Sequence, residues 1–331
     1  MDPIRLDDRT LPEYLHSAGL VAAGEAVTVE AAGDGNINWV RRVRAGGRSF
    51  VVKQARGSLE RFPEYHAPTE RIVCEARYYE TVRPLDRDGV CPAVLRFDES
   101  QRVLVLEDLG AVQRLDAALA DGLDARASAA RIACFLGAVH AATATDPALA
   151  DRFPNDGMRR LHGEHIFVLP FHANEFPLPP AVLERAREIW RDARVAAIAA
   201  EAYDRYLTPR GALVHGDVQA GNVLLATRGA VLLDAEIAHA GDPTFDLGTL
   251  FAHLWLPAVA RGEALRAEPA IDAARQAYSE SNRGFDAAGW LRARRYAALE
   301  MLRRTLGAAR VAAVAEPAAS LRVIDFALPL L

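Results

Sequence analysis

Short apolar stretches between about residues 26 and 110 have the character of β-strands, because each is rich in Val, Leu or Phe. Their sequences are VTVEAAG, NWVRRV, RSFVVKQA, AVLRFD and RVLVLEDL. Between the third and the fourth stretch, the apolar residues of 68–85 recur with helical spacing. This part of the chain is therefore predicted to contain five strands and one helix.

After Gly110 the pattern changes to long helical repeats rich in Ala, Leu and Arg, so the rest of the chain is predicted to be mainly α-helical. The exception is residues 212–234, where short apolar runs broken by Gly indicate β-segments on either side of a loop. Residues 151–180 are rich in Pro, His and aromatic residues without a clean period, which fits an irregular insertion near a substrate site or a plain surface connection. We expect an N-terminal lobe, residues 1–108, and a helical C-terminal lobe, residues 109–331.

The composition is that of an ordinary globular protein, with 331 residues of which 51% are hydrophobic and 25% charged. A net charge of −5 and the absence of a run of Lys or Arg argue against a nucleic-acid partner. The three cysteines, Cys74, Cys91 and Cys134, lack CxxC spacing and are expected to be reduced and buried. No apolar stretch approaches 18 residues, so we expect a cytoplasmic protein without a membrane segment.

Two polar motifs follow the β-segments of the second half. The sequence LVHGDVQAGNVLL places Asp217 and Asn222 five residues apart in a loop, where an Asp can accept a hydrogen bond from a hydroxyl group and an Asn can bind Mg²⁺. The sequence VLLDAE then places Asp234 and Glu236 at the end of an apolar strand. A single Asp in such a place is usually a cap or turn residue, but the two motifs together favour a metal site.

Charged residues in the first half fit phosphate binding. Lys53 lies between apolar residues of a predicted strand and needs an anionic partner, for which Glu75 on the predicted helix is suited. Held by Glu75, Lys53 would contact the α- and β-phosphates of a nucleotide. Each residue alone would more often be a solvated surface charge.

Two backbone segments complete this prediction. Glycines at 33 and 35 would let backbone N–H groups approach phosphate oxygens, although the same four residues also suit a hairpin turn. These residues are Gly33, Asp34, Gly35 and Asn36. The run VLVLEDLG is expected to lead from a strand into the connection between the lobes, where the backbone of Glu107 to Leu109 would bind the edge of adenine.

With HGDxxxxN, DxE, the strand lysine and the helix glutamate, the chain resembles the aminoglycoside phosphotransferase and choline kinase superfamily, which is itself similar to protein kinases. The tract LLDAEIAHAGDPTFDLGTL resembles the superfamily's metal-binding Asp and its GDPxxDLG segment, in which Asp246 would anchor the loop. The resemblance implies a bilobal α+β protein-kinase-like fold with an antiparallel sheet. It also implies ATP and Mg²⁺ as cofactors, Asp217 as catalytic base, and a small-molecule hydroxyl group as acceptor.

Three stretches, GDGNINWV, FVVKQA and EMLRRTLGAARV, look most like the 5-methylthioribose kinase family, in which an arginine pair helps to hold the sugar. That pair maps onto Arg303 and Arg304, for which a solvated helix face is the alternative. The loop HGDVQAGN departs from the HGDLHTGS typical of that family, so the resemblance defines the reaction better than the substrate.

The alternatives are an aminoglycoside or other antibiotic phosphotransferase, and a nucleotide-binding pseudokinase. A protein kinase is disfavoured because Gly216 replaces the arginine of HRD and no DFG and APE pair is present. His215 is expected to pack and shape the loop rather than to act as a base. Whether the protein is a monomer or a homodimer stays open.

Overall fold

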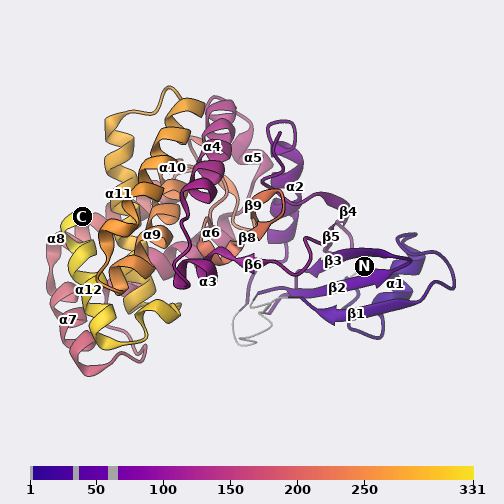
Figure 1. The fold of residues 1–331 in the computed structure, drawn as a ribbon, viewed down its shortest axis with the longest axis horizontal. Helices are drawn as coiled ribbons and strands as arrows, with labels where there is room; N and C mark the ends of the chain where they lie inside the picture. The colour runs from indigo at the N-terminus through magenta and orange to yellow at the C-terminus, as the bar shows by residue number, and fades with distance from the viewer. Residues whose placement is uncertain (1–2, 33–36, 59–65) are drawn as a thin grey trace.

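A computed structural model describes residues 3–32, 37–58 and 66–331. A β-sheet with two helices forms one end of the molecule, and a larger group of helices forms the other (Figure 1). The lobe boundary expected at residue 108 stays a prediction. The loop residues Gly33 to Asn36, assigned above to phosphate binding, lie outside the described residues.

Among the described residues, five strands form an antiparallel sheet, as the sequence predicts. The strands are β1 (Val27–Ala31), β2 (Trp39–Ala45), β3 (Arg48–Gln54), β4 (Val94–Asp98) and β5 (Val103–Glu107), in the order β1-β2-β3-β5-β4. Gly46 and Gly47 connect β2 to β3 with φ angles of 54° and 75°, a pair of left-handed residues typical of a tight hairpin.

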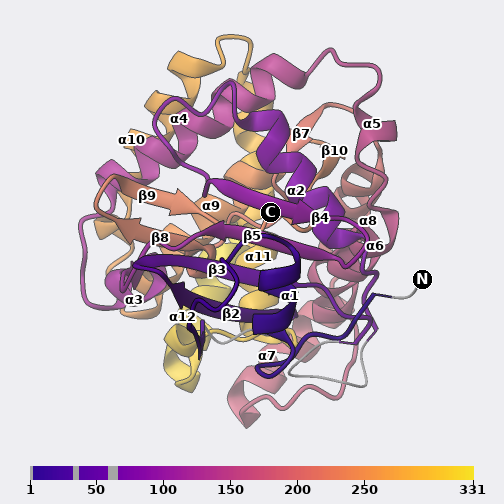
Figure 2. The same cartoon turned by 90° about the vertical axis from the view of Figure 1, so that its right-hand side faces the viewer.

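The two faces of this sheet are covered by different helices (Figure 2). Along β5, Val103 and Val105 pack with α1 (Leu11–Ser17), whereas Leu104 and Leu106 belong to the core that contains α2 (Arg71–Val82). Alternate residues of a strand point to opposite faces, so β5 is buried from both sides. The sequence predicts α2 but not the short α1.

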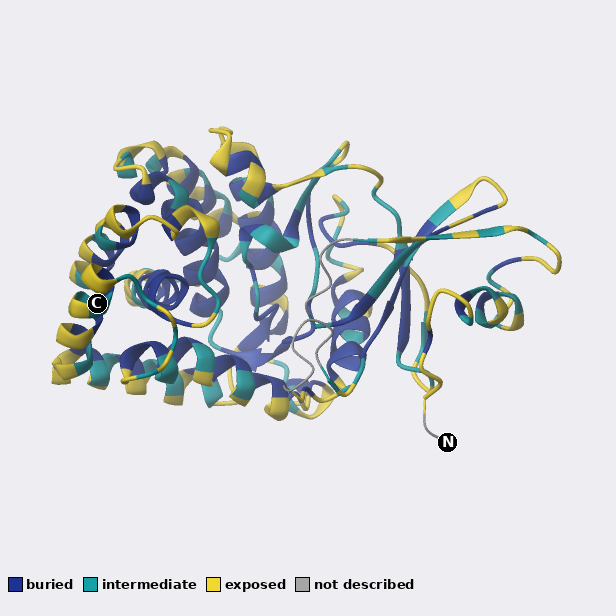
Figure 3. Ribbon diagram, turned by 90° about the horizontal axis from the view of Figure 1, so that it is seen from below, coloured by how far each residue is buried: buried dark blue, intermediate teal, exposed yellow. Residues whose placement is uncertain are grey.

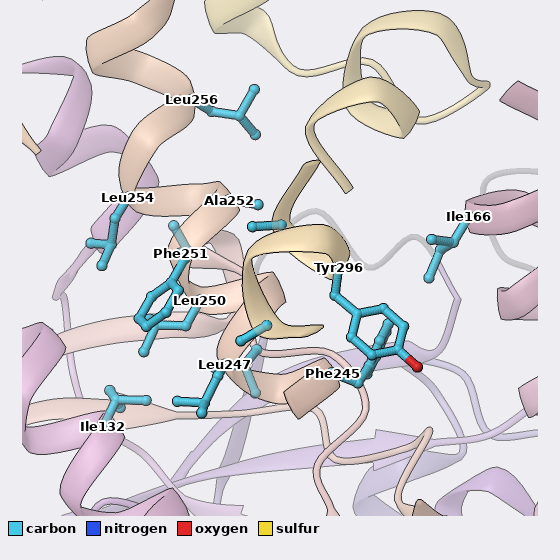
Figure 4. Packing of buried hydrophobic residues seen from close by; sticks show 14 of the residues in the cluster. Ile132, Ile166, Phe245, Leu247, Leu250, Phe251, Ala252, Leu254, Leu256 and Tyr296 are labelled. Carbon is cyan, nitrogen blue, oxygen red and sulfur yellow. The ribbon is translucent and has the colours of Figure 1, made fainter. Parts of the chain in front are cut away.

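The helical part is built around α9 (Thr244–Ala260), in which nearly every side chain is buried. It packs against α11 (Ala287–Leu306), and α4 (Arg126–Thr143) packs against α10 (Glu268–Ser281). Figure 4 shows Leu247, Phe251 and Leu254 of α9 in this core. In Figure 3 the buried residues of the helices lie toward the interior and the exposed residues toward the outside. The other helices here are α3 (Leu115–Ala120), α5 (Leu149–Arg152), α6 (Asp156–Gly163), α7 (Pro180–Arg191), α8 (Ala193–Leu207) and α12 (Pro317–Ala327).

Residues 151–180 are more regular than expected. They include the end of α5, all of α6, a π-helical turn at Glu164–Val168 and a 3₁₀ turn at Leu169–Phe171. The buried residues of α6 include Arg159 and His162, so hydrophobicity alone did not reveal its helical period. Residues 172–179 do lack regular structure, as predicted.

Short strands hold two loops in place within the helical part. Strand β7 (Ala212–Val214) pairs with β10 (His239–Gly241), and β8 (Val223–Ala226) lies between β6 (Gln113–Arg114) and β9 (Gly229–Leu232). Residues 215–222, between β7 and β8, are called the Asp217 loop below, and residues 233–238, between β9 and β10, the Asp234 loop. The predicted β-segments around a loop are therefore present.

The structure bears on two expectations from composition, the burial of the cysteines and the lack of a membrane-spanning segment. Cys74 and Cys91 are free and buried as expected, but Cys134 is exposed, because it lies on the outer side of α4. In the described part of the chain, every helix is too short or too polar to cross a membrane.

Candidate active site

A buried carboxylate on α9 anchors the Asp217 loop. Asp246 accepts hydrogen bonds from the backbone N–H groups of His215 (2.7 Å) and Gly216 (2.9 Å), and its Oδ2 lies 3.2 Å from Nε2 of His140. Burial alone would raise the pKa of Asp246, but these contacts outweigh it and hold the pKa below its ordinary value. Asp246 is therefore charged, and its contacts are those of the anchor that the sequence suggested.

The same loop needs a glycine and a neutral histidine. Gly216 has a φ angle of 84°, and a Cβ there would lie 2.7 Å from the carbonyl oxygen of Ile237. His215 is fully buried edge-on to Tyr78, and its Nδ1 accepts the N–H of Asp217. Burial lowers the pKa of His215 to about 4, so the ring is uncharged at neutral pH. These contacts favour the packing role over a general base.

Asp217 is held by two amide side chains. Its Oδ2 accepts hydrogen bonds from Nε2 of Gln219 and Nδ2 of Asn222, each at 2.8 Å. The Asn222 amide also donates to the backbone carbonyl of Asp217 at 3.0 Å. Both N–H groups of this amide are therefore directed at Asp217, and its amide oxygen faces the other way. Burial raises the pKa of Asp217 to about 6, although Arg304 and Arg303 lower it.

The predicted arginine pair lies next to this carboxylate and is not a solvated helix face. Arg303 and Arg304 are each less than a tenth exposed, and both bind Glu300 of α11, at 3.0 and 2.6 Å. Nη2 of Arg304 donates to Oε1 of Gln219 at 2.8 Å. Gln219 therefore links the arginine pair to Asp217, a contact that the sequence analysis did not predict.

Lys53 connects the sheet to the Asp234 loop. Its Nζ lies 2.7 Å from Oε2 of Glu75 and 2.6 Å from Oδ1 of Asp234. Burial alone would lower the pKa of Lys53, but these carboxylates outweigh it and hold the pKa above its ordinary value. The predicted pairing of Lys53 with Glu75 is present, and the same lysine also brings Asp234 to the sheet.

The backbone of Asp234 is in an unusual conformation, with a φ angle of 65°. Its N–H donates to Oη of Tyr79 at 3.0 Å, and this hydroxyl donates to Oε1 of Glu75 at 3.2 Å. Tyr79 therefore holds the loop and the lysine's partner in one arrangement. Its role was not visible in the sequence, because tyrosine on an amphipathic helix usually only packs.

Glu236, the third predicted metal ligand, is 6% exposed, and one of its oxygens is occupied. Oε2 of Glu236 accepts a hydrogen bond from Nδ2 of Asn38 at 2.7 Å and lies 3.5 Å from Nε of Arg71. Neither Asn38 nor Arg71 was singled out in the sequence.

A cleft of about 420 Å³ between the sheet and the helical part is lined by Lys53, Asp217, Asn222, Asp234 and Glu236. The structure thus brings together residues that lie far apart in the chain, such as Asn38 and Glu236. Mg²⁺ prefers oxygen ligands and usually takes one or two protein carboxylates together with phosphate oxygens. The amide oxygen of Asn222 and the carboxylates of Asp234 and Glu236 fit that preference.

Among the described residues, no three His, Cys, Asp or Glu side chains converge closely enough to hold a metal by themselves. In nucleotide sites Mg²⁺ usually takes part of its ligands from phosphate oxygens and water rather than from a complete set of protein side chains.

The far end of the cleft is apolar and includes the predicted adenine contacts. Its apolar lining comes from Val40, Val51, Pro92, Leu106, Leu224 and Leu233. Glu107 and Leu109 also line it, but the N–H of Glu107 donates to the carbonyl of Ala93, and its side chain binds Arg228. Of the two residues, the carbonyl of Glu107 and the N–H of Leu109 remain suited to adenine.

Comparisons with known proteins agree with this geometry. A family described as the phosphotransferase enzyme family matches residues 28–296. The methylthioribose kinase of Bacillus cereus (strain AH820) is 27% identical over 270 residues, which cover 79% of this chain and 68% of that protein. The corresponding protein of Bacillus thuringiensis (strain Al Hakam) is 26% identical with the same coverage.

Two solved structures share the fold at low sequence identity. A choline/ethanolamine kinase family protein from Mesorhizobium loti has a TM-score of 0.52 and 19% identity, covering 97% of this chain and 94% of its own. An ethanolamine kinase from Plasmodium vivax has a TM-score of 0.54 and 11% identity, covering 99% and 89%. The expected bilobal protein-kinase-like fold is confirmed.

Proposed function

The chain belongs to the phosphotransferase enzyme family and is a small-molecule kinase, and we propose that it phosphorylates a hydroxyl group of a small polyhydroxylated molecule, a sugar such as 5-methylthioribose, with ATP as donor. The observation that carries the proposal is the convergence of Lys53, Asp217 and Asp234 on one cleft with an apolar end. Phosphoryl transfer needs mainly positioning and charge neutralisation, which these side chains supply. We place the reaction in the cytoplasm because ATP is available there.

In the proposed reaction, Asp217 orients the acceptor. Gln219 and Asn222 occupy Oδ2, so we assign Oδ1 to the acceptor hydroxyl. The hydroxyl oxygen forms a bond to the γ-phosphorus, the bond from this phosphorus to the β–γ bridging oxygen breaks, and ADP leaves. The hydroxyl proton passes to Asp217, whose raised pKa makes it a better base than an exposed carboxylate.

Charge neutralisation falls to other side chains that line the cleft. Lys53, held by Glu75, would contact the α- and β-phosphates. Asn222, Asp234 and Glu236 would hold Mg²⁺, which when bound supplies positive charge against the phosphate oxygens. The apolar end of the cleft would hold adenine, with the carbonyl of Glu107 and the N–H of Leu109 at its edge.

The charges beside Asp217 favour an uncharged acceptor over a polycationic one. Arg303 and Arg304 are buried next to the loop, and their two positive charges are balanced by Glu300 and Asp217, so neither of these carboxylates is left to bind a cation. An aminoglycoside would bring several further positive charges to this place, where low polarity strengthens repulsion. A neutral sugar would meet hydrogen-bond donors instead. The methylthioribose kinases among the relatives agree with this choice.

A screen of ATP consumption over 5-methylthioribose, other pentoses, aminoglycosides and amino alcohols tests the substrate. Asp217→Asn should reduce turnover by at least a thousandfold while ADP still binds, because the substitution removes the base and keeps the shape of the loop. Asp192→Asn, the same change at the exposed N-cap of α8, is the matched control and should keep full activity. Turnover by Asp217→Asn at the wild-type rate would contradict the mechanism, and ADP binding without turnover of any acceptor would indicate a pseudokinase.

A further inference from the structure

Arg71, the first residue of α2, is completely buried although it carries a charge. Its guanidinium group donates to backbone carbonyl groups from several segments of the sheet domain. These carbonyl groups belong to Ile37, Arg56, Ala67 and Pro68, at 2.9 to 3.2 Å. A buried arginine is costly unless its donors are satisfied, so this residue fixes the segments that it binds.

The remaining nitrogen of Arg71, Nε, is connected to the helical part of the molecule through Asn38. Its Nε donates to Oδ1 of Asn38 at 3.1 Å, and Nδ2 of Asn38 donates to Oε2 of Glu236 at 2.7 Å. Arg71 also lies 3.5 Å from that oxygen. Asn38 precedes β2 of the sheet, whereas Glu236 belongs to the Asp234 loop, so a buried polar chain joins the two lobes. We call these three residues the Asn38–Arg71–Glu236 latch.

Apolar contacts lie beside the latch and join the same two parts. Ala67 forms a small buried cluster with Met158 of α6 and Ile237 of the Asp234 loop. Pro68 lies so close to α6 that a Cβ on Gly157 would be 2.7 Å from its Cγ. The segment that leads into α2 is therefore docked on the helical part through both polar and apolar contacts.

The position of the latch relates it to the cleft. Ile37, Asn38 and Glu236 line the same cleft as Lys53 and Asp234. Since Oε2 of Glu236 is occupied by Asn38, Oε1 is the oxygen left for a metal. The latch therefore acts on a side chain that lines the cleft and leaves one of its two carboxylate oxygens open, in addition to joining the two parts of the fold.

We propose that Asn38 and Arg71 are positioning residues that latch the sheet lobe onto Glu236 and hold the nucleotide cleft in its binding-competent arrangement. The inference rests on the proposed function, because it assumes that the cleft binds a nucleotide. Without the latch, the lobes separate part of the time, and the apparent affinity for nucleotide falls by the fraction of molecules that stay competent.

Calorimetric titration with ADP in EDTA tests the latch apart from catalysis and apart from metal binding. Asn38→Ala removes the contact to Glu236 and should weaken ADP binding about tenfold, which corresponds to about 1.4 kcal/mol, the range of one charge-assisted hydrogen bond. Arg71→Lys keeps the charge but loses the fork of donors, and should weaken binding in the same direction. With MgATP, both variants should raise the KM for ATP and leave the KM for the acceptor unchanged.

Asn155→Ala is the matched control. Asn155 is also a buried asparagine whose Nδ2 binds this loop, but it donates to the backbone carbonyls of Glu236 and Ala238 from within the helical part. It should lower thermal stability while leaving the affinity for ADP within twofold of wild type. Equal losses in Asn38→Ala and Asn155→Ala, or wild-type affinity in Asn38→Ala, would overturn the latch. Failure of the wild-type protein to bind ADP would instead overturn the proposed function.

Discussion

Asp246→Asn isolates what one buried carboxylate contributes to the Asp217 loop. The carboxylate accepts one backbone N–H on each oxygen, from His215 and Gly216, and lies against His140. Asparagine has the same shape, but it offers one oxygen and one NH₂ group. One backbone N–H would then face another donor at a fully buried position.

The cost follows from these contacts. A buried donor without an acceptor costs about 1–3 kcal/mol, and the surviving hydrogen bond loses about 1 kcal/mol because its acceptor is no longer charged. We therefore expect the free energy of unfolding to fall by about 2–4 kcal/mol, or about 3–6 °C in Tm for a chain of this size. Turnover should fall at least tenfold, because the loop that carries Asp217 loses its anchor.

Urea unfolding followed by circular dichroism measures the free energy, and steady-state kinetics measure turnover. Asp192→Asn is again the matched control, since Asp192 also accepts two backbone N–H groups, from Arg194 and Val195, but at an exposed helix cap where Asn serves equally well. Its free energy of unfolding should change by less than about 0.5 kcal/mol. Equal effects of the two substitutions would refute the reasoning, because burial would then add nothing to the cost.

Three further results are expected. Burial raises the pKa of Asp217 to about 6, so kcat/KM should fall about tenfold per pH unit below pH 6, and an acidic limb near pH 4 would contradict that assignment. Burial lowers the pKa of His215 and of His239 from 6.5 to about 4. Between these pH values the unfolded chain binds more protons than the folded protein, so stability falls as the pH falls. Each histidine should remove roughly 2 kcal/mol of unfolding free energy between pH 6.5 and 5. His239→Gln should reduce this pH dependence of the unfolding free energy, and an unchanged slope would exclude the histidine. Gly248→Ala should lower the unfolding free energy by about 1–3 kcal/mol, because the added Cβ would lie 2.4 Å from a side-chain atom and 2.7 Å from a backbone oxygen of α11. In the control Gly284→Ala, the added Cβ would meet one atom at 4.0 Å, so the unfolding free energy should change little.

The parts of this protein that the sequence could predict are those encoded by neighbouring residues. The five strands appear as short apolar runs, and α2 appears as a helical repeat, because both periods are local. Asp217 and Asn222 lie within one loop, so their spacing alone indicates that the side chains can meet. The contact between Lys53 and Glu75 followed from a different argument, since a lysine on a buried strand needs an anionic partner.

The parts that the sequence could not predict depend on charged residues buried by tertiary contacts. Arg71 and Glu300 read as ordinary polar residues of amphipathic helices, and only the packed structure shows that both are fully or almost fully buried. In α6 the buried positions include Arg159 and His162, which hid the helix from a hydrophobicity pattern. Such residues are satisfied by partners far away in the chain, and no local pattern records those partners.

Each of the two loops that line the cleft is tied to a buried arginine through a side-chain amide. Arg304 reaches Asp217 through Gln219, and Arg71 reaches Glu236 through Asn38. An amide is suited to this place because it accepts from the guanidinium and donates to the carboxylate at once. A carboxylate held by a bidentate arginine would have both oxygens occupied and its pKa lowered, so it would be less able to accept a proton or a metal. The intervening amide transmits position while leaving one carboxylate oxygen free, which is the property that a base or a metal ligand requires.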